Sequence, residues 1–334
     1  MKKIATLLTV ISFIFAQKPY FQQHVAYDID VTLDDSLHTL SAYEKLTYTN
    51  NSSDELDFIW FHLWPNAYKN NETAFGKQAF DLGSTKFHFA NDYARGYIDS
   101  LDFRVNGESV TLEYHPDWND VAKVHLPNPL KPGESVLIET PFYVKIPLVF
   151  SRLGHSGKHY EITQWYPKPA VYDNDGWHPM PYLDMGEFYS EFGTFDVRIT
   201  LPKNYRIMAT GDLVDGEAEY AWLDSLAIEA DELHGLEKKE FKSRIKELTK
   251  NNDEETEEMK TLHFHQENVH DFAWFADPNW IVRKGELKFE ESGRSVTLWS
   301  MYLPKNAGLW EYSIEYLNDA TYWYSKFYLE YPYN

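Results

Sequence analysis

The chain has 334 residues, of which 43% are hydrophobic and 17% aromatic, so it has enough apolar material for one large or two ordinary folded cores. Its formal net charge is −21 and it shows no cationic stripe, so we expect no nucleic acid among its partners. It contains no cysteine, which excludes disulfides and thiolate zinc ligands.

The first sixteen residues have the pattern of a secretory signal peptide. Lys2 and Lys3 form a basic start, Ile4 to Phe15 form an apolar segment too short to cross a bilayer, and Ala16 offers a small residue for cleavage. The alternative is a buried N-terminal helix. No second apolar run is long enough for a membrane span, so we expect a soluble mature protein that is secreted or periplasmic.

Residues 18 to about 215 are predicted to form a largely antiparallel β domain, because period-2 alternation dominates them. The segment VAYDIDVTLD places five apolar residues on one strand face: Val25, Tyr27, Ile29, Val31 and Leu33. The segment LDFRVNGESVTLEYH has the pair Asn106-Gly107 between two alternating runs, which is typical of a β-hairpin.

Residues 216–259 differ from their surroundings because they are helix-forming and highly charged. A short apolar stripe contains Trp222, Leu223, Leu226 and Ala227, and the remaining Glu and Lys side chains are typical of a solvated helix surface. The sequence therefore predicts a helical insertion between two strands of the β domain.

The last segment, LPKNAGLWEYSIEYLNDATYWYSKFYLEYPYN, is predicted to contain an amphipathic helix. Apolar and aromatic side chains recur at helical spacing at Trp310, Ile314, Leu317, Thr321, Tyr324 and Tyr328, after Leu303-Pro304 and before Tyr331-Pro332. The remaining residues hardly supply a partner for this face. Either the helix packs on the β domain or the chain is the front part of a longer protein.

Three histidines are the candidate metal ligands. His263 and His265 share one face of a predicted strand, and His270 follows after a turn, although a structural or surface role is the alternative. The zinc motif H-E-x-x-H is absent, as are the hydrolase elbow G-x-S-x-G and the glycine patterns of phosphate and dinucleotide sites. We therefore assign neither a catalytic residue nor a metal ligand within this chain.

The segment 163–197 is irregular and rich in proline, aromatic and acidic residues, which is typical of a functional loop. Its rings form either a sugar or peptide platform or the packing of the loop itself: Trp165, Tyr166, Tyr172, Trp177 and Tyr182. Two of its carboxylates are candidates for a glycosidase pair: Asp173, Asp175, Asp184, Glu187 and Glu191. The run DNDG at 173–176 favours an Asx-type turn over a calcium loop.

The run ITQWYPKPAVYDNDGWHPMPYLDMGEFYSEFGTFDVRITLPKNYRIMATGDL resembles the N-terminal domain of the aminopeptidase N-like (gluzincin) family of zinc metallopeptidases, in its secreted bacterial branch. Shorter matches are IWFHLWPNAYKNNETAF at 59–75, NVHDFAWFADPNW at 268–280 and the closing YLEYPYN. The resemblance implies a saddle-like antiparallel β domain over 17–280, with 216–259 as its insertion. It also implies that an α+β thermolysin-like catalytic domain begins at residue 281.

The same resemblance implies what this chain lacks. In the family, the zinc motif follows later than residue 334, so the chain is similar to an N-terminal portion whose zinc ligands and C-terminal catalytic domain lie elsewhere. It is expected to be inactive by itself. The full-length protein is expected to hydrolyse peptides with a zinc-activated water. A secreted β-rich module that binds glycans or peptides without catalysis is the alternative.

The resemblance carries one functional position into this sequence. Thr163-Gln164 matches a family T-Q that reaches into the substrate cleft, so Gln164 is expected to hold the amino terminus of a peptide. Two residues later the family often has an acidic or amide residue, and here Tyr166 takes that substrate-binding place. A phenol does not supply the same charge, so strict aminopeptidase specificity stays open.

Overall fold

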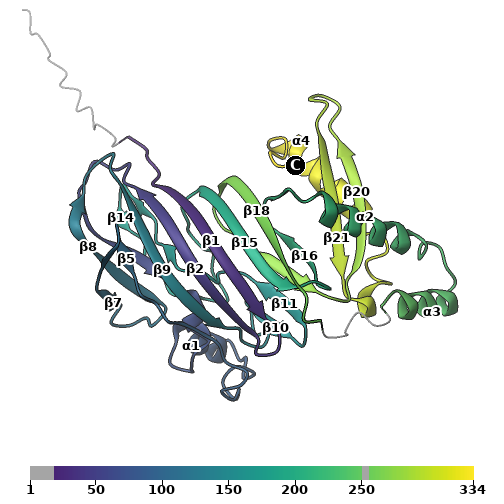
Figure 1. Cartoon of the computed structure of the whole chain (residues 1–334), viewed down its shortest axis with the longest axis horizontal. Coiled ribbons are helices and arrows are strands. Elements are labelled where there is room, and N and C mark those ends of the chain that lie inside the picture. Colours follow the sequence, from purple (N-terminus) through teal and green to yellow (C-terminus); the bar gives the residue numbers. More distant parts are fainter. Residues whose placement is uncertain (1–18, 250–255) are drawn as a thin grey trace, which may run out of the picture.

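The computed structural model describes residues 19–249 and 256–334, and strands make up most of its regular structure (Figure 1). The predicted fold class, mainly β with antiparallel sheets, is confirmed. The predicted signal peptide at 1–16 lies outside the described residues. Within those residues, no helix is both long and apolar enough to cross a membrane.

A nine-stranded sheet forms the body of the molecule, and Figure 1 shows its long strands side by side. In spatial order its strands are β17 (Asp212–Val214), β18 (Met259–Val269), β15 (Gly193–Pro202), β1 (His24–Asp34), β2 (Thr39–Thr49), β9 (Ser135–Lys145), β5 (Arg104–Val105) and β6 (Glu108–Ser109), and β4 (Tyr97–Asp99) also pairs with β9. The alternation predicted for β1 is confirmed, since its five apolar residues are all no more than 3% exposed.

The pairing of β1 with β15 is parallel, whereas the other strand pairs in the described sheets are antiparallel. Gly193, the first residue of β15, lies opposite Val25. A Cβ at Gly193 would come within 2.3 Å of the Val25 carbonyl oxygen, so only glycine permits this close approach.

Two four-stranded sheets flank the large one. The first has the order β10 (Gly154–Ser156), β11 (His159–Ile162), β19 (Trp274–Asp277) and β16 (Arg206–Ala209), and the second has the order β12 (Lys168–Pro169), β3 (Leu56–His62), β8 (Val121–Leu130) and β7 (Leu112–Tyr114). The buried faces of all three sheets contribute to one continuous apolar core.

Short elements complete the fold. They are the hairpins β13 (Tyr172–Asp173) with β14 (Gly176–Trp177) and β20 (Ile281–Lys288) with β21 (Ser295–Tyr302), the helices α1 (Ala74–Asp81), α2 (Glu217–Asp231), α3 (Lys238–Leu248) and α4 (Ser313–Phe327), and the 3-10 turns η1 (Trp64–Tyr68) and η2 (Pro304–Asn306). The hairpin predicted at Asn106-Gly107 is confirmed as β5–β6, with φ angles of 50° and 84° at its two turn residues.

Within the predicted helical insertion at 216–259 the structure has α2 and α3, which lie between the neighbouring strands β17 and β18. Residues 250–255 of the prediction lie outside the described residues, and Met259 is the first residue of β18 rather than part of a helix. The two helices cover the β20–β21 hairpin: Leu223 and Ala227 of α2 are buried against Val282 of β20. The insertion therefore ties the hairpin to the large sheet.

Helix α4 lies on the other face of the same hairpin. Ile314 packs over Gly285 of β20 and against a small apolar cluster on β20 and β21. Most aromatic residues in and after the helix stay exposed, including Tyr316, Tyr324, Phe327 and Tyr328 at 61%, 68%, 71% and 77%. The division of the chain into two domains at residue 281 stays a prediction.

Candidate substrate-binding site

The predicted site residue Gln164 lies just beyond the end of β11, and it faces the start of β19. Because these two strands are antiparallel, the end of one lies beside the beginning of the other, which brings Asp271 next to Gln164. The Gln164 backbone has a φ of 49°. A non-glycine residue in the left-handed region is strained, and such strain persists only where surrounding contacts hold it.

Asp271 organises this site by accepting four hydrogen bonds. The donors are Gln164 Nε2 at 3.1 Å, the Tyr166 hydroxyl at 2.8 Å, the Phe272 backbone N–H at 2.9 Å and Lys168 Nζ at 3.2 Å. Burial alone would raise the pKa of the Asp271 carboxyl, but Lys168 and these side-chain donors outweigh it and hold that pKa below its usual value. Asp271 is therefore a carboxylate at neutral pH.

Lys168 is the buried counter-charge of Asp271. Its side chain is 3% exposed, and its ammonium also donates to the His270 carbonyl at 2.7 Å. Burial lowers the pKa of Lys168, and the attraction of Asp271 opposes that shift. The pair makes the site close to neutral overall.

Tyr166, the second predicted substrate-binding residue, has its ring in the core. It is 2% exposed and packs edge-to-face against Tyr27 and Trp165, with ring centroids 5.3 and 5.4 Å apart. Burial and the nearby Asp271 raise the pKa of its hydroxyl well above the usual value, so the phenol stays neutral. The structure brings Tyr166 and Gln164 together on Asp271, and their assignment to substrate binding stays a prediction.

Gln164 keeps one unused hydrogen-bonding atom. Its Nε2 donates to Asp271, whereas its carbonyl oxygen Oε1 is buried and has no partner in the described chain. The neighbouring Thr163 hydroxyl is also buried without a partner. An unsatisfied buried acceptor costs about 1–3 kcal/mol, and a ligand that donates to Oε1 would remove that cost.

The three candidate metal ligands do not meet. His263 Nε2 and His265 Nδ1 both lie near Asp196 Oδ1, at 2.9 and 3.1 Å, whereas the His270 ring packs near Phe192. In the ranges 19–249 and 256–334 no group of three or more such side chains is arranged to hold a metal ion. A catalytic zinc needs three protein ligands and an open position, so the residues described here do not fit one.

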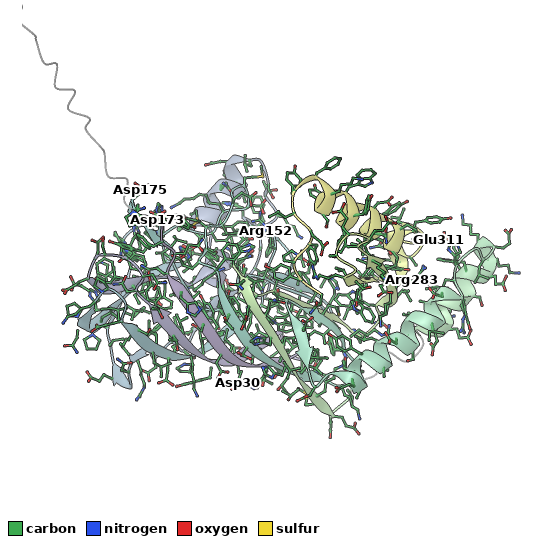
Figure 2. The ribbon with its side chains drawn as sticks, turned by 90° about the horizontal axis from the view of Figure 1, so that it is seen from above. Asp30, Arg152, Asp173, Asp175, Arg283 and Glu311 are labelled. Atoms are coloured by element: carbon green, nitrogen blue, oxygen red, sulfur yellow. The ribbon has the colours of Figure 1, made fainter. Side chains whose placement is uncertain are left out.

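Two acidic residues of the 163–197 segment, Asp173 and Glu191, have partners within the segment. Asp173 lies 2.8 Å from His178 Nε2, and it accepts from the Tyr189 hydroxyl and the Asp175 N–H, so DNDG forms an Asx-type turn. Figure 2 shows Asp173 and Asp175 together at one end of the molecule, far from Arg283 and Glu311. Glu191 is 4% exposed and accepts from the Tyr172 N–H.

The five rings of this segment separate into two groups. Trp165, Tyr166 and Tyr182 are core residues with at most 2% exposure, whereas Tyr172 and Trp177 are half-buried, with centroids 5.0 Å apart. The rings therefore act mainly as packing, and no wall of five rings forms.

Sequence reasoning missed the central role of Asp271 and Lys168. It also missed His159, which lies between Asp277 and Glu161 at 3.2 and 3.3 Å. The i, i+2 spacing of His159 and Glu161 on a strand was a visible signal for a shared face. Nothing in the sequence indicated that Asp277, more than a hundred residues later, completes the cluster.

Comparison with known proteins gives matches among solved structures only. No protein-family model matches the sequence, and no curated protein matches it. One matching structure is a two-domain M1 zinc metallopeptidase variant bound to L-arginine, at 15% identity and a TM-score of 0.42, over 86% of this chain and 48% of that one.

Two further matches are M1 zinc metallopeptidase structures from Deinococcus radiodurans. A variant bound to a Tyr-Ser-Ala substrate has 15% identity and a TM-score of 0.43, over 84% of this chain and 48% of that one. The unsubstituted enzyme has 16% identity and a TM-score of 0.41, over 86% and 48%. The chain spans about half the length of these structures.

Proposed function

We propose that this chain is the N-terminal part of a secreted zinc-dependent metallopeptidase similar to aminopeptidase N. Its β domain forms one wall of the substrate cleft, and Gln164 holds the amino terminus of a peptide. The observation that carries the proposal is the Gln164 side chain itself: it is held on a strained backbone by Asp271, with a carbonyl oxygen that lacks a donor.

The chemistry of Gln164 suits a peptide amine. Its carbonyl dipole accepts from an ammonium without needing a proton transfer. Asp271 is balanced by Lys168, and Tyr166 is neutral, so this wall offers a dipole rather than a free negative charge. A strong preference for a free amine would therefore have to come from residues outside this chain.

The last residues of the chain contact the segment that leads from β18 to Asp271. The Tyr333 hydroxyl donates to the Asn268 carbonyl at 2.8 Å, three residues before Asp271. Arg294 donates to the carbonyls of Tyr331, Pro332 and Tyr333, which fixes the tail in place. Asn334 donates to Asp212 of the edge strand β17, so a segment that follows residue 334 would start at that edge of the large sheet, and it is there that zinc ligands would be sought. Such a zinc would supply the activated water.

The experiment starts from the codons that follow residue 334. We expect an open frame that encodes H-E-x-x-H. The protein from the whole frame, loaded with zinc, should hydrolyse leucyl-aminomethylcoumarin, and cell fractionation should find it outside the cytoplasm. In that enzyme Gln164→Ala should raise KM about tenfold with a smaller effect on kcat, because one charge-assisted hydrogen bond is lost.

Gln266→Ala is the matched control, because the side chain of this glutamine on β18 donates to the Glu267 carbonyl and to no other group in the ranges 19–249 and 256–334. Its KM should equal that of the parent enzyme. A stop codon directly after residue 334 would refute the proposal. So would stoichiometric zinc binding together with hydrolysis by the 334-residue chain alone.

A glycan- or peptide-binding module is the second candidate, and one observation favours it. The ring centroid of Trp177 lies 5.0 Å from that of Tyr172 and 6.0 Å from that of Phe58. All three rings are partly exposed, so together they form a small aromatic surface. Saturable binding of an oligosaccharide by the 334-residue chain, abolished by Trp177→Ala, would support this module.

A further inference from the structure

A cleft lies at the end of β11 opposite to Gln164, between the β10–β11–β19–β16 sheet and the segment formed by β21 and η2. Its polar end has a volume of about 690 Å³ and is lined by His159, Glu161, Asp277 and Lys305, among others. Its apolar end has about 470 Å³, shares His159 and Glu161, and is lined by Met208, Phe275, Trp299 and Met301.

Strand alternation explains why polar and apolar groups meet on one face of this sheet. His159 and Glu161 are two apart on β11, so both leave the core, whereas Tyr160 and Ile162 are buried. In the sheet register Phe275 lies opposite Glu161, and Met208 lies opposite Phe275. The floor of the cleft therefore changes from charged to apolar within two strands.

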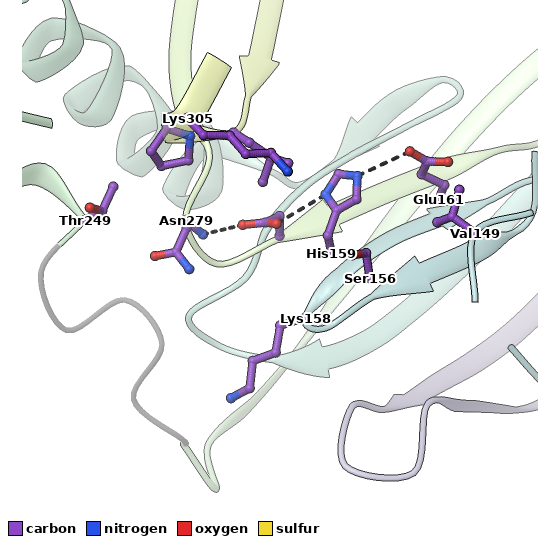
Figure 3. Close-up of a pocket in the computed structure, with 11 residues that line it drawn as sticks. Val149, Ser156, Lys158, His159, Glu161, Thr249, Asn279 and Lys305 are labelled. Carbon is purple, nitrogen blue, oxygen red and sulfur yellow. Dashed lines mark hydrogen bonds and ion pairs between the residues drawn. The ribbon is translucent and has the colours of Figure 1, made fainter. Parts of the chain in front are cut away.

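His159 is held as a cation at the polar end (Figure 3). Its Nδ1 lies 3.2 Å from Asp277 Oδ2 and its Nε2 lies 3.3 Å from Glu161 Oε1. The hydrogen bonds to Asp277 and then Glu161 raise the pKa of His159 to about 9. Asp277 also accepts from the Asn279 N–H, and it lies opposite the buried Arg206 in the sheet. Both carboxylates are thus neutralised.

Lys305 approaches from the other wall of the cleft. It lies on η2, it is exposed, and it makes no hydrogen bond or ion pair with any residue in the described ranges. Lys158 also lines this end, and its ammonium lies 3.8 Å from Asp35. Four cations therefore stand at this end, namely Lys158, His159, Lys305 and the buried Arg206 beside Asp277, against three carboxylates, Asp35, Glu161 and Asp277. This local excess of positive charge stands out in a chain whose net charge is −21.

We propose that this cleft binds an amphipathic anion, namely a single carboxylate carried on an aromatic or long aliphatic body. The carboxylate lies at the end with Lys305 and His159, and the body lies against Met208, Phe275 and Met301. One surplus cation matches one carboxylate better than a doubly charged phosphate. Methionine side chains adapt to apolar bodies of different shapes.

Calorimetric titration of the purified chain tests this with three probes: N-acetyl-phenylalanine, its uncharged amide, and decanoate. Both acids should bind with one-to-one stoichiometry, and the amide should bind at least tenfold more weakly than its acid. Tighter binding of N-acetyl-phenylalanine would identify a peptide carboxyl end as the source of the ligand. Tighter binding of decanoate would identify a fatty acid.

Single substitutions in the cleft test where the carboxylate and the apolar body of the ligand bind. Lys305→Gln should raise the Kd of both acids at least tenfold and leave that of the amide unchanged, whereas Phe275→Ala should weaken decanoate about tenfold. Lys288→Gln replaces an exposed lysine of the β20–β21 hairpin outside the cleft, and it should leave the Kd of all three probes unchanged. The proposal fails if the acid and the amide bind equally, if neither acid saturates, or if Lys305→Gln binds both acids like the parent chain. None of these outcomes depends on peptidase activity.

Discussion

At the scale of single residues, buried carboxyl groups hold the irregular 163–197 segment on the β core. Asp120 accepts from the Tyr182 N–H at 2.7 Å, Glu191 accepts from the Tyr172 N–H at 3.3 Å, and Asp271 holds the start of the segment. A loop without a regular backbone ladder must satisfy its N–H groups in this way. The conformation of the loop is therefore sensitive to the protonation of these groups.

Asp120 should make stability depend on pH. Burial raises the pKa of this 1% exposed carboxyl to about 7 in the folded chain, from 3.8. The folded state then keeps a proton that the unfolded chain releases, so the stabilising contribution is full below about pH 4, falls as the pH rises, and is lost above about pH 7. Asp120→Asn removes this loss. The free energy of unfolding of the variant should be nearly equal to that of the parent at pH 4 and should exceed it by about 2–4 kcal/mol at pH 8.

Urea unfolding at several pH values measures this difference. The matched control is Asp117→Asn, an exposed carboxyl in the same connection, which should follow the parent at every pH. Glu191, whose pKa burial also raises to about 7, is present in all three proteins and cancels from the comparison. Parallel pH profiles for Asp120→Asn and the parent would contradict the prediction.

The Lys168–Asp271 pair should show strong coupling. Lys168→Met leaves the Asp271 charge buried without its counter-ion, which we expect to cost about 3–5 kcal/mol of unfolding free energy. The double variant Lys168→Met, Asp271→Asn should recover at least half of that loss, because no buried charge then remains. A double-mutant cycle in denaturant measures the coupling.

The exposed pair Lys203–Glu258, with nitrogen and oxygen 2.7 Å apart, is the control for that cycle. Its side chains are 65% and 70% exposed, so Lys203→Met should leave the unfolding midpoint essentially where it is. Additive effects of the Lys168 and Asp271 substitutions would show that the buried pair does not act as a unit.

At the scale of elements, local pattern predicts local structure well. Alternation predicted β1, the Asn106-Gly107 pair predicted the β5–β6 turn, and helical spacing predicted α4, because each signal depends on neighbours in the sequence. The parallel pairing of β1 with β15 left no such signal, since its partners are about 170 residues apart. Asp271 and Gln164 are likewise far apart in the sequence, so no local pattern predicted their contact. Gln164 was proposed as a site residue from a family resemblance rather than from a sequence pattern.

The packing of α4 against β20 depends on one glycine. A Cβ at Gly285 would come within 2.4 Å of Ile314 Cγ2, so Gly285→Val should lift the start of α4 from the hairpin. Hydrogen exchange of amides in 313–327 should then become at least tenfold faster. Gly308→Ala, where a Cβ meets nothing within 4 Å, is the control and should exchange like the parent. Unchanged protection in Gly285→Val would show that α4 is held by other contacts.

At the scale of the whole molecule, polarity is distributed unevenly. The long sheet buries its apolar faces in one core, whereas large aromatic side chains gather in the open on and after α4. Single exposed apolar residues are normal, but contiguous apolar patches on soluble proteins usually mark a contact surface. This is the surface that the proposed downstream part of the protein would cover.

That aromatic surface should make the 334-residue chain bind hydrophobic dyes and self-associate. A triple variant, Trp323→Gln, Phe327→Gln and Tyr328→Gln, replaces side chains that are 48%, 71% and 77% exposed, so it removes apolar surface without opening the core. We expect anilinonaphthalene sulfonate fluorescence to fall at least twofold and sedimentation to shift towards the monomer, while the unfolding midpoint stays within about 1 °C because surface substitutions change stability little. The control is Leu37→Gln, Leu82→Gln and Phe89→Gln, which removes exposed apolar residues elsewhere on the molecule. If this control lowers dye binding and association as much as the α4 variant, the surface on α4 has no special tendency to form contacts.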